Sequence, residues 1–210
     1  DARFRAQNDP SQGAFDKGNN SYEIQIPKSI PTGTRWVRRD EFIDGKNLTA
    51  LTIIDGVSDI PSGVINREDY KQAISLLVRN YVYQLTETGL VHSDIHPGNF
   101  RITPDNKKVA VFDRYNLLEL DEAQKKLISS FVKGFASGGV EQTVRATMDY
   151  LFGLEENSDL SGDKHEILSR VLESSNSANL ESGIINAVIS LKQRGVFVPI
   201  TITLIVKNLF

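Results

Sequence analysis

The sequence contains no cysteine. This excludes a disulfide framework and any metal site built on thiolates, and it leaves the redox compartment undetermined. The apolar runs are all well short of the roughly 18 residues that a membrane-spanning helix needs. The net charge is only −3, so the bulk electrostatics do not indicate a nucleic-acid-binding protein. A chain of 210 residues is nevertheless long enough to bury a core as one domain or one large lobe.

The beginning of the chain has neither an initiating methionine nor a signal-peptide pattern. We therefore expect the chain to begin inside a longer protein. Residues 1–21 are polar and rich in Asn, Gly and Asp. Within them, Phe4 and Phe15 are the candidate anchors of a helix end and a loop.

The most informative segment is Val91-His92-Ser93-Asp94-Ile95-His96-Pro97-Gly98-Asn99. After Asn99 the chain alternates like a short strand, turns at residues 104–106 and returns as an apolar strand that ends before Asp113. A hairpin brings its two ends together, so Asn99 and Asp113 are predicted to ligate one metal ion.

An Asp, a following Asn and a second Asp after the next strand form the acidic core of a nucleotide-dependent phosphoryl-transfer site. In that pattern Asp94 is the predicted catalytic residue, which accepts the proton of the attacking hydroxyl. Asn99 and Asp113 are the predicted ligands of magnesium, which they hold against the nucleotide phosphates. Each residue alone is better explained as a cap or a turn, but the combination with a closing hairpin favours the phosphoryl-transfer interpretation.

Other segments are expected to form strands and helices in a definite order around this motif. Before it, we expect strands at 23–27 and 36–42, a turn at 43–45, a short helix capped by Asn47 or Thr49, and a loop over 55–66. A helical repeat begins at Glu68 and ends at Gly89. After the hairpin, Asp121 is expected to cap a helix over 122–136, with further helices over 140–152, 163–174 and 180–194.

This order predicts an α+β fold of the protein-kinase type. It combines a mostly helical C-lobe, which contains the catalytic-loop hairpin, with the remnant strands of an N-lobe. Residues 1–45 are assigned to the rear part of the N-lobe and the hinge, and residues 46–210 to the helical C-lobe.

The motifs resemble the UbiB/AarF/ADCK family of atypical, protein-kinase-like proteins, whose loop runs His-small-Asp-Pro-His-Pro-Gly-Asn. Three further segments match outside the loop. Glu41-Phe42-Ile43-Asp44-Gly45 is similar to the hinge of the family, Ile26-Pro27-Lys28 to its Val-Pro-Arg/Lys step, and 194–199 with 204–207 to its closing segment. The resemblance covers about residues 22–210. Aminoglycoside and choline phosphotransferases share the loop alone, so the hinge and the C-terminal segment disfavour them.

The resemblance implies ATP and Mg²⁺ as cofactors. It also implies that Glu41 and Phe42 present backbone groups to adenine and that His92 packs under the metal-binding turn. His96 is assigned a loop-orienting role, because magnesium prefers oxygen ligands. The resemblance also implies that the last apolar segment, 200–210, is helical.

The family further implies an atypical kinase or ATPase that supports isoprenoid-quinone (ubiquinone) biosynthesis. Its expected partners are a nucleotide and lipid or quinone-pathway proteins at a membrane surface, on the cytoplasmic face of a bacterial membrane or in an organelle. Neither a nucleic-acid partner nor a transmembrane segment is expected in this chain.

The chain departs from the family pattern in several places. Asp113-Arg114-Tyr115 stands where the family has Asp-Phe-Gly, which removes the freedom of a glycine and places a guanidinium beside a metal-binding carboxylate. Asp40 falls where the adenine pocket is expected, and an unpaired carboxylate is costly to bury there. The nucleotide-covering loop, the strand Lys with its helix Glu and the Lys-x-Gly-Gln segment are expected upstream of Asp1, so residues 1–210 alone are expected to be inactive.

Two alternatives to an active enzyme of this family are therefore kept: a degenerate pseudokinase that acts as a binding or scaffold module, and a small-molecule phosphotransferase of the aminoglycoside/choline type. The position of the Arg114 side chain distinguishes the pseudokinase from an active enzyme. A guanidinium beside Asp94 and Asp113 would replace the metal ion, whereas one that points to solvent or to Glu119 would leave the site open. Because neighbouring residues on an extended segment point to opposite sides, the open site is favoured.

Overall fold

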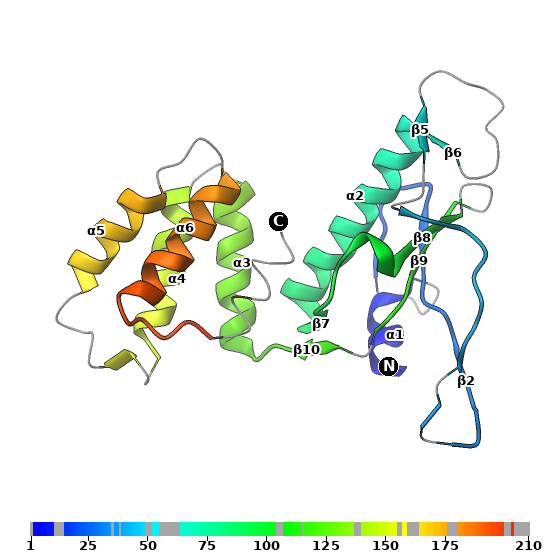
Figure 1. Ribbon diagram of the computed structural model, residues 1–210, viewed down its shortest axis with the longest axis horizontal. Helices are drawn as coiled ribbons and strands as arrows, with labels where there is room; N and C mark the ends of the chain where they lie inside the picture. Colours follow the sequence, from blue (N-terminus) through cyan, green and yellow to red (C-terminus); the bar gives the residue numbers. More distant parts are fainter. Residues whose placement is uncertain are drawn as a thin grey trace. The chain divides into compact units, whose positions relative to one another are not determined.

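In the computed structural model the chain folds into two compact units (Figure 1). The first unit comprises residues 1–84 and 90–117, and the second comprises residues 85–89 and 118–210. The structure describes residues 2–10, 15–34, 36–37, 39–48, 52–54, 64–103, 107–114, 116–136, 140–154, 157–158, 164–175, 180–199 and 203. These residues form small sheets and six α-helices, in agreement with mixed α and β content. The two units divide the chain at other positions than residue 45, and the predicted lobe boundary there stays a prediction.

The first unit is built on a four-stranded sheet with the strand order β1-β9-β8-β4. Strands β8 (Phe100–Thr103) and β9 (Lys108–Val111) are antiparallel neighbours, which confirms the predicted hairpin. Strand β1 (Glu23–Gln25) is parallel to β9, and β4 (Lys46–Asn47) is antiparallel to β8. Because β1 and β9 are parallel, the segments that follow them leave the sheet at the same edge. The predicted turn at 104–106 lies outside the described residues.

Two further strand pairs belong to the first unit, and they correct the sequence prediction. Strands β2 (Ser29–Ile30) and β3 (Arg39–Asp40) form an antiparallel ribbon, and β5 (Thr52–Ile54) is parallel to β6 (Val64–Asn66). The strand predicted over 36–42 is therefore only two residues long. Trp36 and Val37 remain 80% and 57% exposed, so they provide no buried face that would extend the strand.

The segment predicted to contain a short helix and a loop also differs from expectation. Asn47 lies in β4, where its Nδ2 donates to the carbonyl oxygen of Gly98 at 3.2 Å, and Leu48 directly after it has a 3₁₀-helical conformation. The residues that would continue a helix from there, 49–51, lie outside the described part of the chain. The other candidate cap, Thr49, lies outside the described residues, as does most of the predicted loop over 55–66. The end of that loop, at 64–66, is strand β6.

The long helix predicted between Glu68 and Gly89 is confirmed, with one irregularity. Helix α2 (Arg67–Tyr83) begins at Asn66, whose Oδ1 accepts a hydrogen bond from the amide of Asp69 at 2.6 Å. It continues as a π-helical turn (Gln84–Thr88). Such turns are rare in proteins, and many of those that occur lie at functional sites. The predicted terminating Gly89 has a φ of 66°, which favours glycine.

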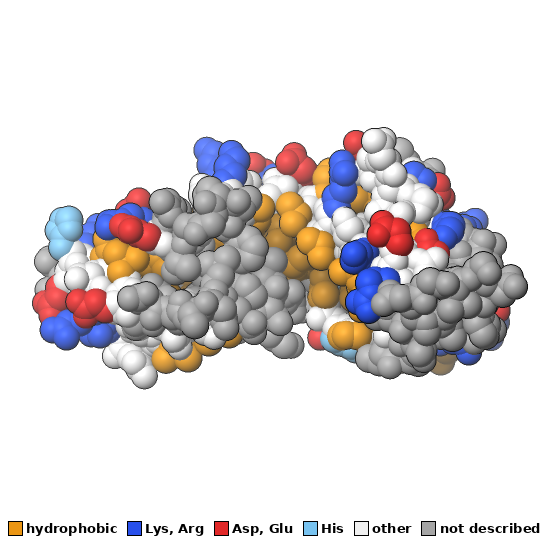
Figure 2. Space-filling view, turned by 90° about the horizontal axis from the view of Figure 1, so that it is seen from above, with side chains coloured by type: hydrophobic (Ala, Val, Ile, Leu, Met, Phe, Trp, Pro, Cys, Tyr) orange, Lys and Arg blue, Asp and Glu red, His pale blue; other side chains and the backbone are white. Residues whose placement is uncertain are grey.

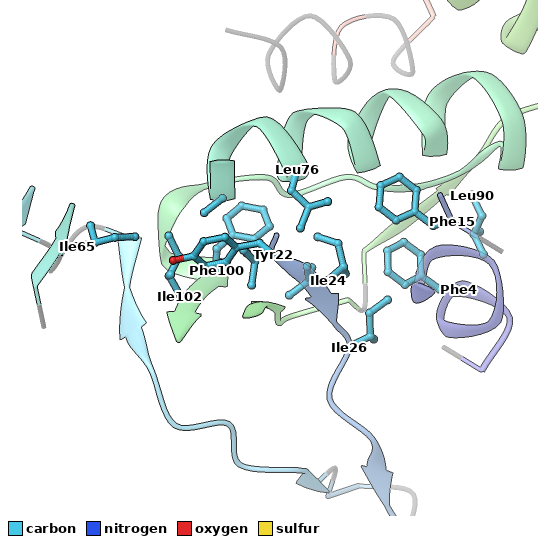
Figure 3. Close-up of a cluster of buried hydrophobic side chains, with 13 residues drawn as sticks. Phe4, Phe15, Tyr22, Ile24, Ile26, Ile65, Leu76, Leu90, Phe100 and Ile102 are labelled. Atoms are coloured by element: carbon cyan, nitrogen blue, oxygen red, sulfur yellow. The ribbon is translucent and has the colours of Figure 1, made fainter. Parts of the chain in front are cut away.

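A cluster of buried apolar side chains forms the core of the first unit (Figure 3). Leu76 of α2 packs onto it from above, with Tyr22, Phe100 and Ile102 toward one end of the cluster and Phe4, Phe15 and Leu90 toward the other. Phe4 belongs to helix α1 (Ala2–Asn8) and is completely buried. Phe15 is 4% exposed. Both phenylalanines therefore anchor the N-terminal segment, as predicted.

Helices make up most of the second unit. The chain enters it along β10 (Leu117–Glu119), and four helices follow: α3 (Glu122–Ala136), α4 (Val140–Phe152), α5 (Lys164–Ser175) and α6 (Leu180–Gln193). These helices lie where the sequence predicted them, and each packs against the next. Their apolar stripes meet in one core, to which they contribute Leu127, Phe131, Val144, Met148, Leu151, Ile167, Val171, Ala187 and Leu191.

The buried side chain of Asn157 connects the segment after α6 to the end of α4 by hydrogen bonds. The Nδ2 of Asn157 donates to the carbonyl oxygens of Leu151 and Phe197 at 2.9 and 3.0 Å, and its Oδ1 accepts from the amide of Phe197 at 2.7 Å. Gly195, with a φ of 75°, allows the turn that precedes this segment. Of the helix predicted over 200–210, only Thr203 is described, in a helical conformation.

The described surface is mixed in charge. On the face drawn in Figure 2, basic and acidic side chains occur in small groups of both signs. Among the described helices, none is both long and apolar enough to cross a membrane.

The start of α3 supplies a test of the fold. The Oδ1 of Asp121 accepts from the amide of Gln124 at 2.8 Å, and the Oε1 of Gln124 accepts from the amide of Asp121 at 3.0 Å, which makes a reciprocal capping box. We expect Asp121→Ala to lower the free energy of unfolding by about 1 kcal/mol, because an amide of the first turn loses its acceptor. Urea denaturation followed by circular dichroism measures this. Asp121→Asn, which keeps the acceptor, should be nearly as stable as the wild type, and an Ala variant of unchanged stability would contradict the assignment.

Candidate functional site

The predicted catalytic and metal-binding residues lie on two loops at the end of the β8–β9 hairpin. Strand β7 (Leu90–His92) leads into the loop of Asp94, which ends in a 3₁₀ turn (Pro97–Asn99) directly before β8. Asp113 follows β9 and is exposed. The side chain of Asp94 is 36% exposed, whereas Asn99 is buried. The carboxylates of Asp94 and Asp113 are thus open to solvent, whereas the side-chain amide of Asn99 is buried.

Asn99 connects the two loops by hydrogen bonds. Its Nδ2 donates to the carbonyl oxygen of Asp94 at 3.0 Å, and its own carbonyl oxygen accepts from the amide of Phe112 at 2.8 Å. Phe112 immediately precedes Asp113. The structure therefore brings the backbones of Asp94, Asn99 and Asp113 into one cluster. An amide nitrogen is only a hydrogen-bond donor, so a cation would bind to the Oδ1 of Asn99, whose side-chain orientation is fixed by the bond of Nδ2 to Asp94.

His92 fixes the same two loops from the protein interior. It is only 1% exposed, and its Nε2 lies 2.9 Å from the carbonyl oxygen of Phe112, which can only accept a hydrogen bond. Nε2 therefore carries the proton, and Nδ1 accepts from the amide of Asp94 at 3.2 Å. One neutral imidazole thus binds the residue before Asp113 and the backbone of Asp94. The structural role that the sequence predicted for His92 agrees with this position.

Burial lowers the pKa of His92, because the imidazolium form would lose its hydration. The hydrogen bond to Phe112 and the negative charges of Asp94 and Asp113 act in the opposite direction, and the positive charge of Arg114 adds to the lowering. The net direction favours the neutral imidazole, and only this form can both donate to Phe112 and accept from Asp94.

Behind His92 lies a chain of buried polar side chains that the sequence analysis missed. The amide of His92 donates to Oε1 of Gln84 at 2.9 Å, Nε2 of Gln84 donates to Oδ1 of Asn80 at 2.7 Å, and Nδ2 of Asn80 donates to the carbonyl oxygen of Asn8 at 3.2 Å. Gln84 is the first residue of the π-helical turn. The available signal was the spacing of Asn80 and Gln84, one helical turn apart on the buried side of α2 and of the turn that continues it.

Two aspartates and a histidine of the loops show further local constraints. His96 accepts from the amide of Gly98 through Nδ1 at 3.1 Å, and its Nε2 lies 3.7 Å from Oδ2 of Asp94. This position suits the predicted loop-orienting role. Asp113 has a φ of 51°. Such left-handed backbone is uncommon outside glycine, although aspartate tolerates it, and it concentrates at functional sites.

Arg114 differs from expectation. It is 2% exposed, so it does not point to solvent. Its Nη1 donates to the carbonyl oxygen of Pro27 at 3.0 Å, and its Nη2 lies 3.9 Å from Oδ2 of Asp40. Asp40, which seemed a costly unpaired carboxylate, thus has a basic partner. Two departures from the family pattern are two halves of one interaction, and sequence reasoning treated them separately.

The predicted hinge residues lie beside this pair. The amide of Glu41 donates to the carbonyl oxygen of Lys28 at 2.8 Å, so its predicted contact with adenine is limited to its carbonyl group. Phe42 is 77% exposed, and the guanidinium of Arg101 lies 5.6 Å from the centre of its ring. The adenine-contacting role of both residues stays a prediction.

The sequence was compared with known protein families and structures. The family model described as the ABC1 atypical kinase-like domain matches residues 11–147, which is more than half of the chain. The chain belongs to the ABC1 atypical kinase-like family. Comparisons with curated proteins and with solved structures gave no match.

Membership of the ABC1 family confirms the resemblance to UbiB, AarF and ADCK proteins and the kinase-like class of the domain. The matched range includes the hinge, the loop of Asp94 and the turn of Asp113. It also disfavours the aminoglycoside/choline alternative, which rested on the loop alone. The closing segment after residue 147 lies beyond the match.

The buried His92 predicts a pH dependence of stability. Its pKa is lower in the folded than in the unfolded chain, where it is about 6.5. Its contribution is therefore fully present above that value and is lost as the pH falls below it, because the unfolded chain then binds an extra proton. We expect the free energy of unfolding, measured in urea, to fall between pH 7 and pH 5.

His92→Gln should flatten this dependence, since it removes the titrating group. His165, an exposed residue at the start of α5, supplies the matched control, and His165→Gln should behave like the wild type. An equally steep dependence in the His92→Gln variant would assign the effect to other groups.

Proposed function

We propose that this protein is an ATP- and Mg²⁺-dependent atypical kinase or ATPase, and that the described loops contain its catalytic aspartate and two metal ligands. The observation that carries the proposal is the position of Asn99. It hydrogen-bonds to the carbonyl oxygen of Asp94 on one side and to the amide of Phe112, next to Asp113, on the other. Kinase-type phosphoryl transfer uses one Asp as the proton acceptor, and an Asn and a second Asp as the ligands of magnesium.

The donor set fits a magnesium ion. The carboxylates of Asp94 and Asp113 and the Oδ1 of Asn99 are hard oxygen donors, which Mg²⁺ prefers over imidazole nitrogen. Asn99 and Asp113 are the proposed ligands. Among the described residues, three or more His, Asp or Glu side chains do not gather into one metal-binding group. When bound, the ion neutralises phosphate charge and orients the phosphates.

The proposed role of Asp94 follows from how its backbone is held. Its amide donates to His92 and its carbonyl oxygen accepts from Asn99, so both ends of the residue are fixed while its carboxylate is partly exposed. A fixed and accessible carboxylate is suited to accept the proton of an attacking hydroxyl. Adenine would contact the carbonyl group of Glu41 and the backbone of Phe42.

The biological setting is proposed from the family alone. UbiB/ADCK-type proteins are linked to isoprenoid-quinone biosynthesis, so we propose lipid or quinone-pathway proteins at a membrane surface as partners. A pseudokinase is the second candidate, supported by Arg114 in place of an apolar residue after Asp113. The contacts of Arg114 with Pro27 and Asp40 weaken this alternative, because they hold the guanidinium at the β2–β3 ribbon.

The metal site is tested by titrating the protein with Mn²⁺ as a paramagnetic substitute for Mg²⁺, followed by electron paramagnetic resonance. We expect Asp113→Asn to weaken binding by about tenfold or more, because one charged ligand is lost. Asp44→Asn removes an equally exposed carboxylate from the hinge segment and should bind like the wild type. Equal affinity of the wild type and the Asp113→Asn variant would exclude Asp113 as a ligand.

Catalysis is tested separately, by phosphate release from ATP in the natural protein. We expect Asp94→Asn to bind Mg²⁺ and nucleotide within a few-fold of the wild type but to lower turnover by roughly 10²–10⁴-fold, as expected for a lost general base. A wild-type protein that binds the nucleotide, and neither releases phosphate nor transfers the phosphoryl group to an acceptor, would support the pseudokinase instead.

A further inference from the structure

Arg114 is a buried cation that directly follows a proposed metal ligand. Its guanidinium contacts the carbonyl oxygen of Pro27, before β2, and lies 3.9 Å from Asp40, in β3. The other carboxylate oxygen of Asp40 accepts from Oγ of Ser29 at 3.0 Å. The guanidinium therefore lies at the base of the β2–β3 ribbon, where Asp40 is itself held in place by the opposite strand.

The register of the sheet explains why these residues meet. Strands β1 and β9 are parallel, and Gln25 is the partner of Ala110. Pro27 lies as far beyond Gln25 as Phe112 lies beyond Ala110, so both segments leave the sheet at the same edge. Arg114 follows shortly after and reaches the ribbon from there. The contact is thus built into the topology of the hairpin that carries Asp113.

We propose that Asp40 is a positioning residue of the magnesium site, which binds Arg114 and thereby keeps its guanidinium off the carboxylates of Asp94 and Asp113. This inference rests on the proposed function. A guanidinium is a strong competitor for any carboxylate within its reach, and a buried charge that loses its partner is strongly destabilised. Without the charge of Asp40, the carboxylates of Asp94 and Asp113 become the competing partners of the guanidinium.

The same contact limits the motion of Asp113. Phe112, on one side, is bound through its amide to Asn99 and through its carbonyl oxygen to His92. Arg114, on the other side, is bound to Pro27. The left-handed conformation of Asp113 is therefore held from both sides, as strained functional residues usually are.

The test compares three variants by Mn²⁺ titration. Asp40→Asn should weaken binding by about tenfold, because the released guanidinium competes for the ligands. The double variant Asp40→Asn with Arg114→Met should return to within about threefold of the wild type, since it releases no cation. Asp44→Asn, a charge loss in the neighbouring hinge, should have no effect. A purely structural role of the pair would leave the double variant at least as weak as the single one.

Two results of the titration would overturn the proposal. The first is an Asp40→Asn variant that binds Mn²⁺ like the wild type, and the second is a double variant that binds as weakly as the single one. Should Asp40→Asn fail to fold, the double variant decides alone: affinity within about threefold of the wild type supports the proposal, and any weaker binding overturns it.

A metal-free readout separates this inference from the proposed function. In a crystal structure of Asp40→Asn without added metal, the guanidinium of Arg114 should lie against Asp94 or Asp113, and one that stays at Pro27 overturns the proposal. If the wild type binds no divalent cation, the proposed function fails. The position of the guanidinium in the variant still decides whether Asp40 holds it away from the two carboxylates.

Discussion

The geometry of the candidate site depends on one buried, neutral imidazole. His92 donates to the carbonyl oxygen of Phe112 and accepts from the amide of Asp94, so it holds both loops from beneath. An imidazolium could not accept the second hydrogen bond, and burial disfavours that charged form. The buried side chains of Gln84 and Asn80 extend this constraint to helix α1. The ligand loops are therefore positioned by the interior of the first unit, although their carboxylates face solvent.

The parallel pairing of β1 with β9 gives the site its second support. It brings the segment after Gln25 and the segment after Val111 to one edge of the sheet, where Arg114 meets Pro27 and Asp40. In the sequence, Asp40 and Arg114 are two separate departures from the motifs of the UbiB/AarF/ADCK family. Together they form a charge pair that holds the guanidinium at the β2–β3 ribbon, so the Arg after Asp113, which suggested an eroded enzyme, is compatible with the proposed open metal site.

Much of this arrangement could be predicted from the sequence, because local patterns specify it. Apolar periodicity and the signals of Gly89 and Asp121 located the helices, and the alternation after Asn99 located the hairpin. The strand that contains Arg39–Asp40 was predicted too long and the strand at Asn47 was missed, since the extent of two-residue strands depends on pairing with distant segments and not on local propensity. The partner of Arg114 was missed for the same reason: it depends on a parallel crossover that no local pattern records.

The central claim is that Asp94, Asn99 and Asp113 surround one divalent cation. Anomalous diffraction from a crystal of the protein soaked in Mn²⁺ tests it most directly, because the peak reports the position of the metal independently of any activity. One peak is expected, coordinated by the carboxylate of Asp113 and the Oδ1 of Asn99, on the side of Asp94. A peak elsewhere, with these oxygens bound to protein groups or to water alone, would contradict it.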